Sequence, residues 1–138
     1  MPVTAEDIRI IKDSLPLVGP RIRPASEQFY ENLFSIAPEL RPLFRADLAG
    51  QGMRFFSTLA TICDLLDEPG ALTDEIADLA RAHAGVGVRP EHFKALGAAL
   101  VVTLGETLAP DFTCEMARAW HNAFDEIADR MIAIGAFA

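Results

Sequence analysis

A single imidazole at the end of an apolar helical stripe is the residue in this chain best suited to metal chemistry. His83 follows Ile76, Leu79 and Ala80 at the i, i+3, i+4 and i+7 spacing, which places all four positions on one face of a helix. Two interpretations are open at this point. His83 is either a core histidine whose hydrogen bonds are satisfied, or a metal ligand with the apolar stripe as the wall of a cofactor pocket.

Three further residues could complete a site around such a ligand. Tyr30 lies on a segment with apolar residues on two sides, Gln51 heads an apolar row that continues through Phe55, and Phe44 follows a proline-rich bend. Each has an ordinary explanation, as a core aromatic residue or as a solvated amide. Taken together with His83, they favour a buried site that combines one metal ligand with two hydrogen-bond donors.

The composition is that of one globular domain, residues 1–138, with 51% hydrophobic residues and a formal net charge of −8. This acidic balance argues against nucleic acid and against an anionic membrane surface as partners, because both require clustered Lys and Arg. No apolar run approaches the roughly 18 residues of a membrane span. The first residues lack the pattern of a signal peptide, so a cytoplasmic location is expected. Cys63 and Cys114 are too few for a disulfide framework, and both are expected to be buried free thiols.

Helical periodicity runs through almost the whole chain, and neither sustained strand alternation nor a tight hairpin turn is visible. Thr73 is predicted to cap a helix that follows a turn at Pro69-Gly70 and stops at the glycines from Gly85 on. Ile36 and Ile134 are predicted to continue buried rows. The expected helices cover about 4–16, 25–36, 48–66, 73–84, 90–108 and 113–134, with a short turn at 38 before a bend at 42. These patterns predict an all-α domain of six or seven helices.

The chain resembles a globin, and in particular the bacterial single-domain haemoglobins and the haem domain of flavohaemoglobins. The resemblance covers about residues 4–134. It rests on FYENLFSIAPELRPLF (29–44), the Gln51, Arg54 and Phe55 group, LARAHAGVGV (79–88) with EHF (91–93), and AW (119–120).

This resemblance implies a globin fold with haem b held between the helix that carries Gln51 and the helix that carries His83. His83 would be the iron ligand, Phe44 would stack on the porphyrin, and Tyr30 with Gln51 would stabilise bound dioxygen by hydrogen bonds. Arg54, Arg89 and His92 would be the candidates to reach the haem propionates. Apolar contacts to the cofactor would come from Leu43, Phe55, Leu79, Val88, Phe93 and Leu96.

The function implied is reversible binding of dioxygen and of other diatomic gases, NO and CO, by a monomer or homodimer. The alternative is an NO dioxygenase that depends on a separate reductase, because the chain ends at Ala138 where flavohaemoglobins continue into a flavin domain. Those relatives also surround the ligand histidine with a tyrosine and a glutamate, where this chain has Phe93, Phe124 and Gly135. The loss of these groups weakens the enzyme hypothesis. A third hypothesis is a helical interaction module without haem, in which His83 is structural.

Overall fold

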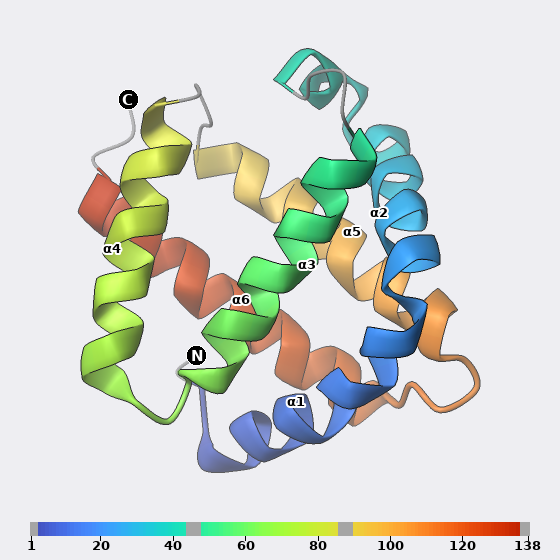
Figure 1. The fold of residues 1–138 in the computed structure, drawn as a ribbon, viewed down its shortest axis with the longest axis horizontal. Coiled ribbons are helices and arrows are strands. Elements are labelled where there is room, and N and C mark those ends of the chain that lie inside the picture. Colours follow the sequence, from blue (N-terminus) through green and yellow to red (C-terminus); the bar gives the residue numbers. More distant parts are fainter. Residues whose placement is uncertain (1–2, 44–47, 86–89, 136–138) are drawn as a thin grey trace.

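The computed structural model describes residues 3–43, 48–85 and 90–135, and these ranges contain helices and no strand. The α-helices are α1 (Ala5–Val18), α2 (Ile22–Ile36), α3 (Leu48–Asp64), α4 (Pro69–Gly85), α5 (Pro90–Leu108) and α6 (Cys114–Gly135), and the 3-10 helices are η1 (Gly19–Arg21) and η2 (Pro38–Leu43). The predicted all-α class is therefore confirmed (Figure 1). No helix in the described ranges is both long and apolar enough to cross a bilayer.

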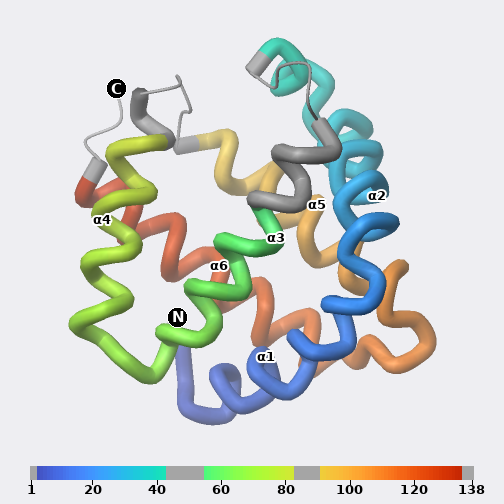
Figure 2. The backbone as a smooth tube through the Cα atoms, in the orientation of Figure 1, coloured from blue at the N-terminus to red at the C-terminus, as the bar shows by residue number. Residues whose placement is uncertain are grey.

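Two groups of packed helices position the candidate site. α2 packs against α3 and α5, whereas α4 and α1 pack against α6, and α5 contacts α6. In Figures 1 and 2, α3 runs between α2 on one side of the molecule and α4 on the other. The helices that carry Gln51 and His83 are therefore separate elements, and α5 and α6 connect the two groups.

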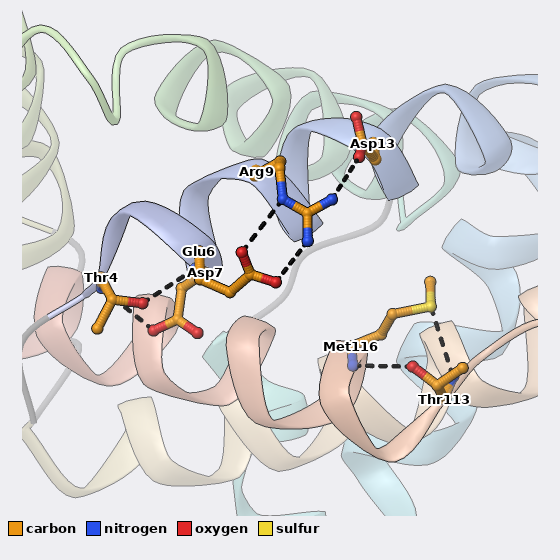
Figure 3. A network of polar contacts seen from close by, with 7 residues as sticks. All are labelled: Thr4, Glu6, Asp7, Arg9, Asp13, Thr113 and Met116. Carbon is orange, nitrogen blue, oxygen red and sulfur yellow. Dashed lines mark hydrogen bonds and ion pairs between the residues drawn. The ribbon is translucent and has the colours of Figure 1, made fainter.

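Side-chain caps fix the beginnings of two helices where the sequence predicts them. The Asp7 N–H donates to Thr4 Oγ1 at 3.1 Å and the Thr4 N–H donates to Asp7 Oδ2 at 3.2 Å, which forms a capping box at the start of α1 (Figure 3). At the start of α6, the Met116 N–H donates to Thr113 Oγ1 at 3.1 Å. Each cap satisfies a helical donor that has no partner within the helix, and is worth about 1 kcal/mol.

Prolines lie at the beginnings of α4 and α2, and α4 begins earlier than the sequence predicts. α4 begins at Pro69, so the predicted turn at Pro69-Gly70 and the predicted cap at Thr73 are both wrong. Proline fits the first position of a helix because its missing N–H has no partner there in any case. The Thr73 hydroxyl instead donates to the Pro69 carbonyl at 2.9 Å and accepts from Arg130 Nη2 at 2.8 Å. The sequence predicts a loose start of α2 at Pro20 and Pro24 before a firm helix from residue 25, and the helix begins at Ile22, with Pro24 in its first turn.

The core follows most of the predicted apolar rows. Phe29, Leu33 and Trp120 are among its largest fully buried or nearly buried side chains. Ile36 and Ile134 depart from the prediction, since they are 47% and 42% exposed. Both lie in the last turn of their helices. The apolar spacing continues to the end of the helix there, but the neighbouring helix does not extend far enough to cover these side chains.

The two cysteines have different environments, and only one prediction about them is confirmed. Cys63 is a buried free thiol, as expected, but Cys114 is exposed at the first position of α6. Burial raises the pKa of the Cys63 thiol from 9.0 to about 12, because a thiolate is poorly solvated in the apolar interior. Because folding raises this pKa, the buried protonated thiol makes its full contribution to the free energy of unfolding below pH 9.0. This contribution is lost as the pH rises toward 12.

The difference between the thiols predicts their reactivity. In the native protein, Ellman's reagent should modify Cys114 promptly and leave Cys63 unmodified until the chain unfolds, since the thiolate is the reactive form. The absorbance of the released thiolate at neutral pH measures both phases. A Cys114→Ser variant should lose the fast phase, and rapid modification of that variant would contradict the burial of Cys63.

Candidate functional site

An apolar cavity lies between α3, α4, α5 and α6. It has a volume of about 90 Å³, or about 700 Å³ of space free of protein atoms when its open mouth is included. Among the described lining residues, the polar groups are the Thr58 hydroxyl, the Cys63 thiol and the Trp120 indole N–H, and the rest are hydrocarbon or backbone. The described lining residues are Phe55, Thr58, Leu59, Ile62, Cys63, Leu66, Leu79, Phe93, Leu96, Leu100, Trp120, Ala123, Phe124, Ile127, Ala128 and Met131. Such a concave apolar space is the usual form of a cofactor or small-molecule site.

The α3 wall of the cavity arises from a helical stripe. Phe55, Leu59 and Ile62 share one face of α3 at the predicted spacing, and all three line the cavity. Thr58 and Cys63 flank this row and also line the cavity. Neither residue is predicted to belong to a site from the sequence, although each is within one position of a stripe residue. Their position beside the apolar stripe is the feature of the sequence that could have identified them as lining residues.

The structure brings four of the predicted wall residues to this same cavity. Phe55 comes from α3, Leu79 from α4, and Phe93 and Leu96 from α5. On α4, residue 83 comes four positions after Leu79, which is about one helical turn further along the same side of the helix. The spacing therefore puts residue 83 on the helix that supplies this wall.

Tyr30 is buried beside the cavity rather than in its described lining. Its side chain is 5% exposed, and its ring packs edge-to-face on Phe29 with ring centroids 5.4 Å apart. Phe29 in turn stacks on Phe55 at 4.6 Å, and Phe55 lines the cavity. Phe34 stacks on the other side of Tyr30 at 5.8 Å, and the Arg41 guanidinium lies 5.1 Å from the Phe34 ring centroid. Aromatic packing thus holds the Tyr30 ring one layer from the described cavity wall.

Several predicted site residues lie outside what the structure describes. Phe44, Val88 and Arg89 fall outside the described ranges altogether. The positions of Leu43, Gln51, Arg54 and His83 lie in η2, α3 and α4, but their side chains are outside the described part of the structure. His92 is half-buried in the first turn of α5 and is not among the lining residues that the structure describes. The roles assigned to all of these residues stay predictions.

Comparison with known proteins decides the family. The family model described as Globin matches residues 27–131, which is most of the chain. The chain belongs to the globin family. Membership of the globin family implies that the chain binds haem.

Individual relatives agree with this membership. The globin is 33% identical over 134 residues to a flavohemoprotein of Vibrio cholerae, covering 94% of this chain and 34% of that protein. It is 28% identical over 132 residues to an uncharacterized globin-like protein of Aquifex aeolicus, covering 96% of this chain and 94% of that one. The solved structure of a bacterial globin from Campylobacter jejuni matches with a TM-score of 0.84 and 26% identity, covering 96% of each chain. The chain thus spans about a third of the length of the flavohemoproteins that it matches first.

The cavity of this globin fits a haem in its chemistry. A porphyrin is a largely apolar ring, and the described lining residues carry no ionised side chain, since burial keeps the Cys63 thiol protonated. Phe93 and Phe124, two of the three positions that the resemblance matches to hydrogen-bonding groups near the ligand histidine of flavohaemoglobins, both line the cavity. Both side chains are hydrocarbon, so the cavity suits an apolar cofactor and these two rings are not hydrogen-bond acceptors for an imidazole N–H.

Gly97 allows the Phe124 ring to pack closely against the backbone of α5. A Cβ atom at residue 97 would lie 2.8 Å from Phe124 Cδ1, a distance that forces the ring to move. Gly105 lies on the same helix, α5, but a Cβ there would meet only an ordinary contact of 3.5 Å with Phe112.

Gly97→Ala should destabilise the globin and lower its haem content. Overpacking of this kind costs about 1–3 kcal/mol, which exceeds the roughly 1 kcal/mol that alanine gains over glycine in a helix. Gly105→Ala, the matched control, should be neutral or slightly stabilising. Urea unfolding and haem absorbance measure both effects, and equal behaviour of the two variants would contradict the contact between Gly97 and Phe124.

Proposed function

We propose that this globin holds haem b and binds dioxygen reversibly, with His83 as the iron ligand and Tyr30 and Gln51 on the gas-binding side. The observation that supports the proposal best is the apolar cavity walled by α3 and α4, the helices that carry residues 51 and 83. The haem would supply the iron that holds the gas. NO and CO are expected to bind at the same place.

The residues of this chain would each have a simple task in that site. Leu79, Phe93 and Leu96 would exclude water from the cofactor. The Leu79 carbonyl, one turn before His83, would accept the other ring N–H of the histidine and thereby orient the imidazole. Tyr30 and Gln51 would donate hydrogen bonds to a polarised gas ligand. Such hydrogen bonds are stronger in a site without water. Arg54, Arg89 and His92 remain candidates to pair with the propionates.

The alternative function, an NO dioxygenase with a separate reductase, has less support. Strong electron donation from the histidine needs an acceptor that increases its basicity, and Phe93 and Phe124 offer none. Repeated turnover of NO to nitrate with an added reductase and nicotinamide cofactor would support the enzyme. A single oxidation of the haem by NO is expected in either case.

Absorption spectra of the purified protein test the proposal directly. The oxidised, reduced and CO-treated forms should each show an intense Soret band, and pyridine extraction should identify the porphyrin as haem b. A colourless protein that takes up no added haem would favour the helical interaction module instead. A single domain, a monomer or homodimer, and a cytoplasmic location are the remaining predictions, to be measured on the same preparation and in fractionated cells.

A further inference from the structure

A cluster of polar side chains links α2 to α5 by hydrogen bonds, and two of its members, Asn32 and Thr103, are 71 residues apart in the sequence. Asn32 Nδ2 donates to Thr103 Oγ1 at 3.0 Å and to Glu106 Oε1 at 2.8 Å. On α2, Gln28 Nε2 donates to Asn32 Oδ1 at 3.2 Å. On α5, the Thr103 hydroxyl donates to the Ala99 carbonyl at 2.7 Å. Asn32 thus joins the two helices by hydrogen bonds.

The hydrogen-bond pattern leaves Asn32 little freedom. The single hydroxyl proton of Thr103 is used on the Ala99 carbonyl, so its oxygen can only accept a hydrogen bond. Thr103 is 0% exposed, and loss of the donor would leave a buried acceptor without that partner. Both the amide N–H₂ and the carbonyl of Asn32 are in use. This arrangement holds the Asn32 side of α2 against α5.

Asn32 and Tyr30 lie on opposite sides of α2. They are two residues apart, which is about 200° around a helix with 3.6 residues per turn. A helix with its side chains has a radius of about 5–6 Å, so a rotation of roughly 10° moves a side-chain tip by about 1 Å. A displacement of about 1 Å can change the rate of a geometry-dependent step by about a hundredfold. A change in the contact on one side of α2 can therefore displace the phenol on the other side, within the limits that the aromatic packing allows.

We propose that Asn32 is a positioning residue for Tyr30 and that it sets how strongly the site prefers dioxygen to carbon monoxide. This inference rests on the proposed function, in which the Tyr30 hydroxyl donates to the gas ligand. Dioxygen gains from a well-placed donor because it becomes polarised when bound, whereas carbon monoxide gains much less. Asn32 acts on this preference from the α5 side of α2, without contact to the gas.

Loss of the hydrogen bonds between Asn32 and α5 should alter gas selectivity more than it alters the fold. Asn32→Ala and the near-isosteric Thr103→Val should each raise the dioxygen dissociation rate several-fold, up to about tenfold, with little change for carbon monoxide. Thr103→Ser, which keeps the hydroxyl, should restore the slow rate. Tyr30 is the only tyrosine in the chain, so the single ring signal of ¹³C-tyrosine-labelled CO-bound protein reports its position independently of the rates. That signal should shift in both variants.

A chemically matched control separates positioning from general destabilisation. The Thr73 hydroxyl also donates to the carbonyl four residues earlier and also accepts a hydrogen bond from another helix. Thr73→Val should leave the dioxygen rate and the tyrosine signal unchanged. In a Tyr30→Phe background, Asn32→Ala should add no further acceleration, because the donor it positions is gone.

The outcomes distinguish this inference from the function on which it rests. If Tyr30→Phe releases dioxygen faster but Asn32→Ala does not, Asn32 has no positioning role and the function stands. If Asn32→Ala still accelerates release in the Tyr30→Phe background, Asn32 acts by another route and the inference is wrong. If neither variant changes the rate, Tyr30 is not the gas-side donor, and both claims about it fail.

Discussion

Replacing His83 with alanine should abolish stable haem binding. In the proposed site this imidazole is the only protein bond to the iron, and the remaining contacts are apolar packing against residues such as Leu79 and Phe93. Loss of a group that merely hydrogen-bonds to a metal ligand lowers metal affinity by up to about 100-fold, so loss of the ligand should cost more. Haem transfer from this variant to apomyoglobin, followed at the Soret maximum, measures the change.

His121→Ala is the matched control for this variant. His121 is exposed on α6, where its Nε2 pairs with Asp125 at 3.2 Å, so its loss should leave the spectrum unaltered. Added imidazole should restore a five-coordinate spectrum to His83→Ala, because the free base can enter the space left by the side chain. Retention of the parental spectrum and gas uptake by His83→Ala, with no other side chain at the iron, would refute the proposed function.

Replacing Tyr30 with phenylalanine should give the largest change in gas kinetics. The substitution removes only the hydroxyl, so the ring contacts with Phe29 and Phe34 are retained. Dioxygen dissociation should become about tenfold faster or more, since each tenfold corresponds to about 1.4 kcal/mol and a hydrogen bond to a charged acceptor is worth about 1.5–3 kcal/mol. Stopped-flow displacement of dioxygen by CO measures the rate, and CO dissociation should change far less.

Thr58→Val controls for the loss of a hydroxyl near the cofactor. Thr58 lines the cavity from α3 but was not assigned to the gas-binding side. Its replacement should leave dioxygen dissociation within about twofold of the parent, a change of only about 0.4 kcal/mol. If Tyr30→Phe behaves like Thr58→Val, the phenol points away from the gas and Gln51 becomes the donor to examine.

The helices and their apolar faces could be predicted from sequence because they depend on local spacing. Phe55, Leu59 and Ile62 line the cavity at the predicted period, and so do Phe93, Leu96 and Leu100. The errors fall at helix ends. Pro69 begins α4 where a turn was expected, and Ile36 is exposed where its row was expected to stay buried. Periodicity reports which side of a helix faces inward, but it does not report how far the neighbouring helix extends.

By itself, the sequence predicted an all-α globin, which the structure and the comparisons confirmed, since fold class and family depend on residue types and short spacings. The positions that it proposes for an iron porphyrin stay predictions. Only the tertiary structure decided that Cys63 is buried while Cys114 is exposed, and that the Tyr30 ring packs on Phe29, which stacks on Phe55 of the cavity wall. It also placed Asn32 against Thr103. These relations join residues far apart in the chain, and the packing of whole helices sets them rather than any local pattern.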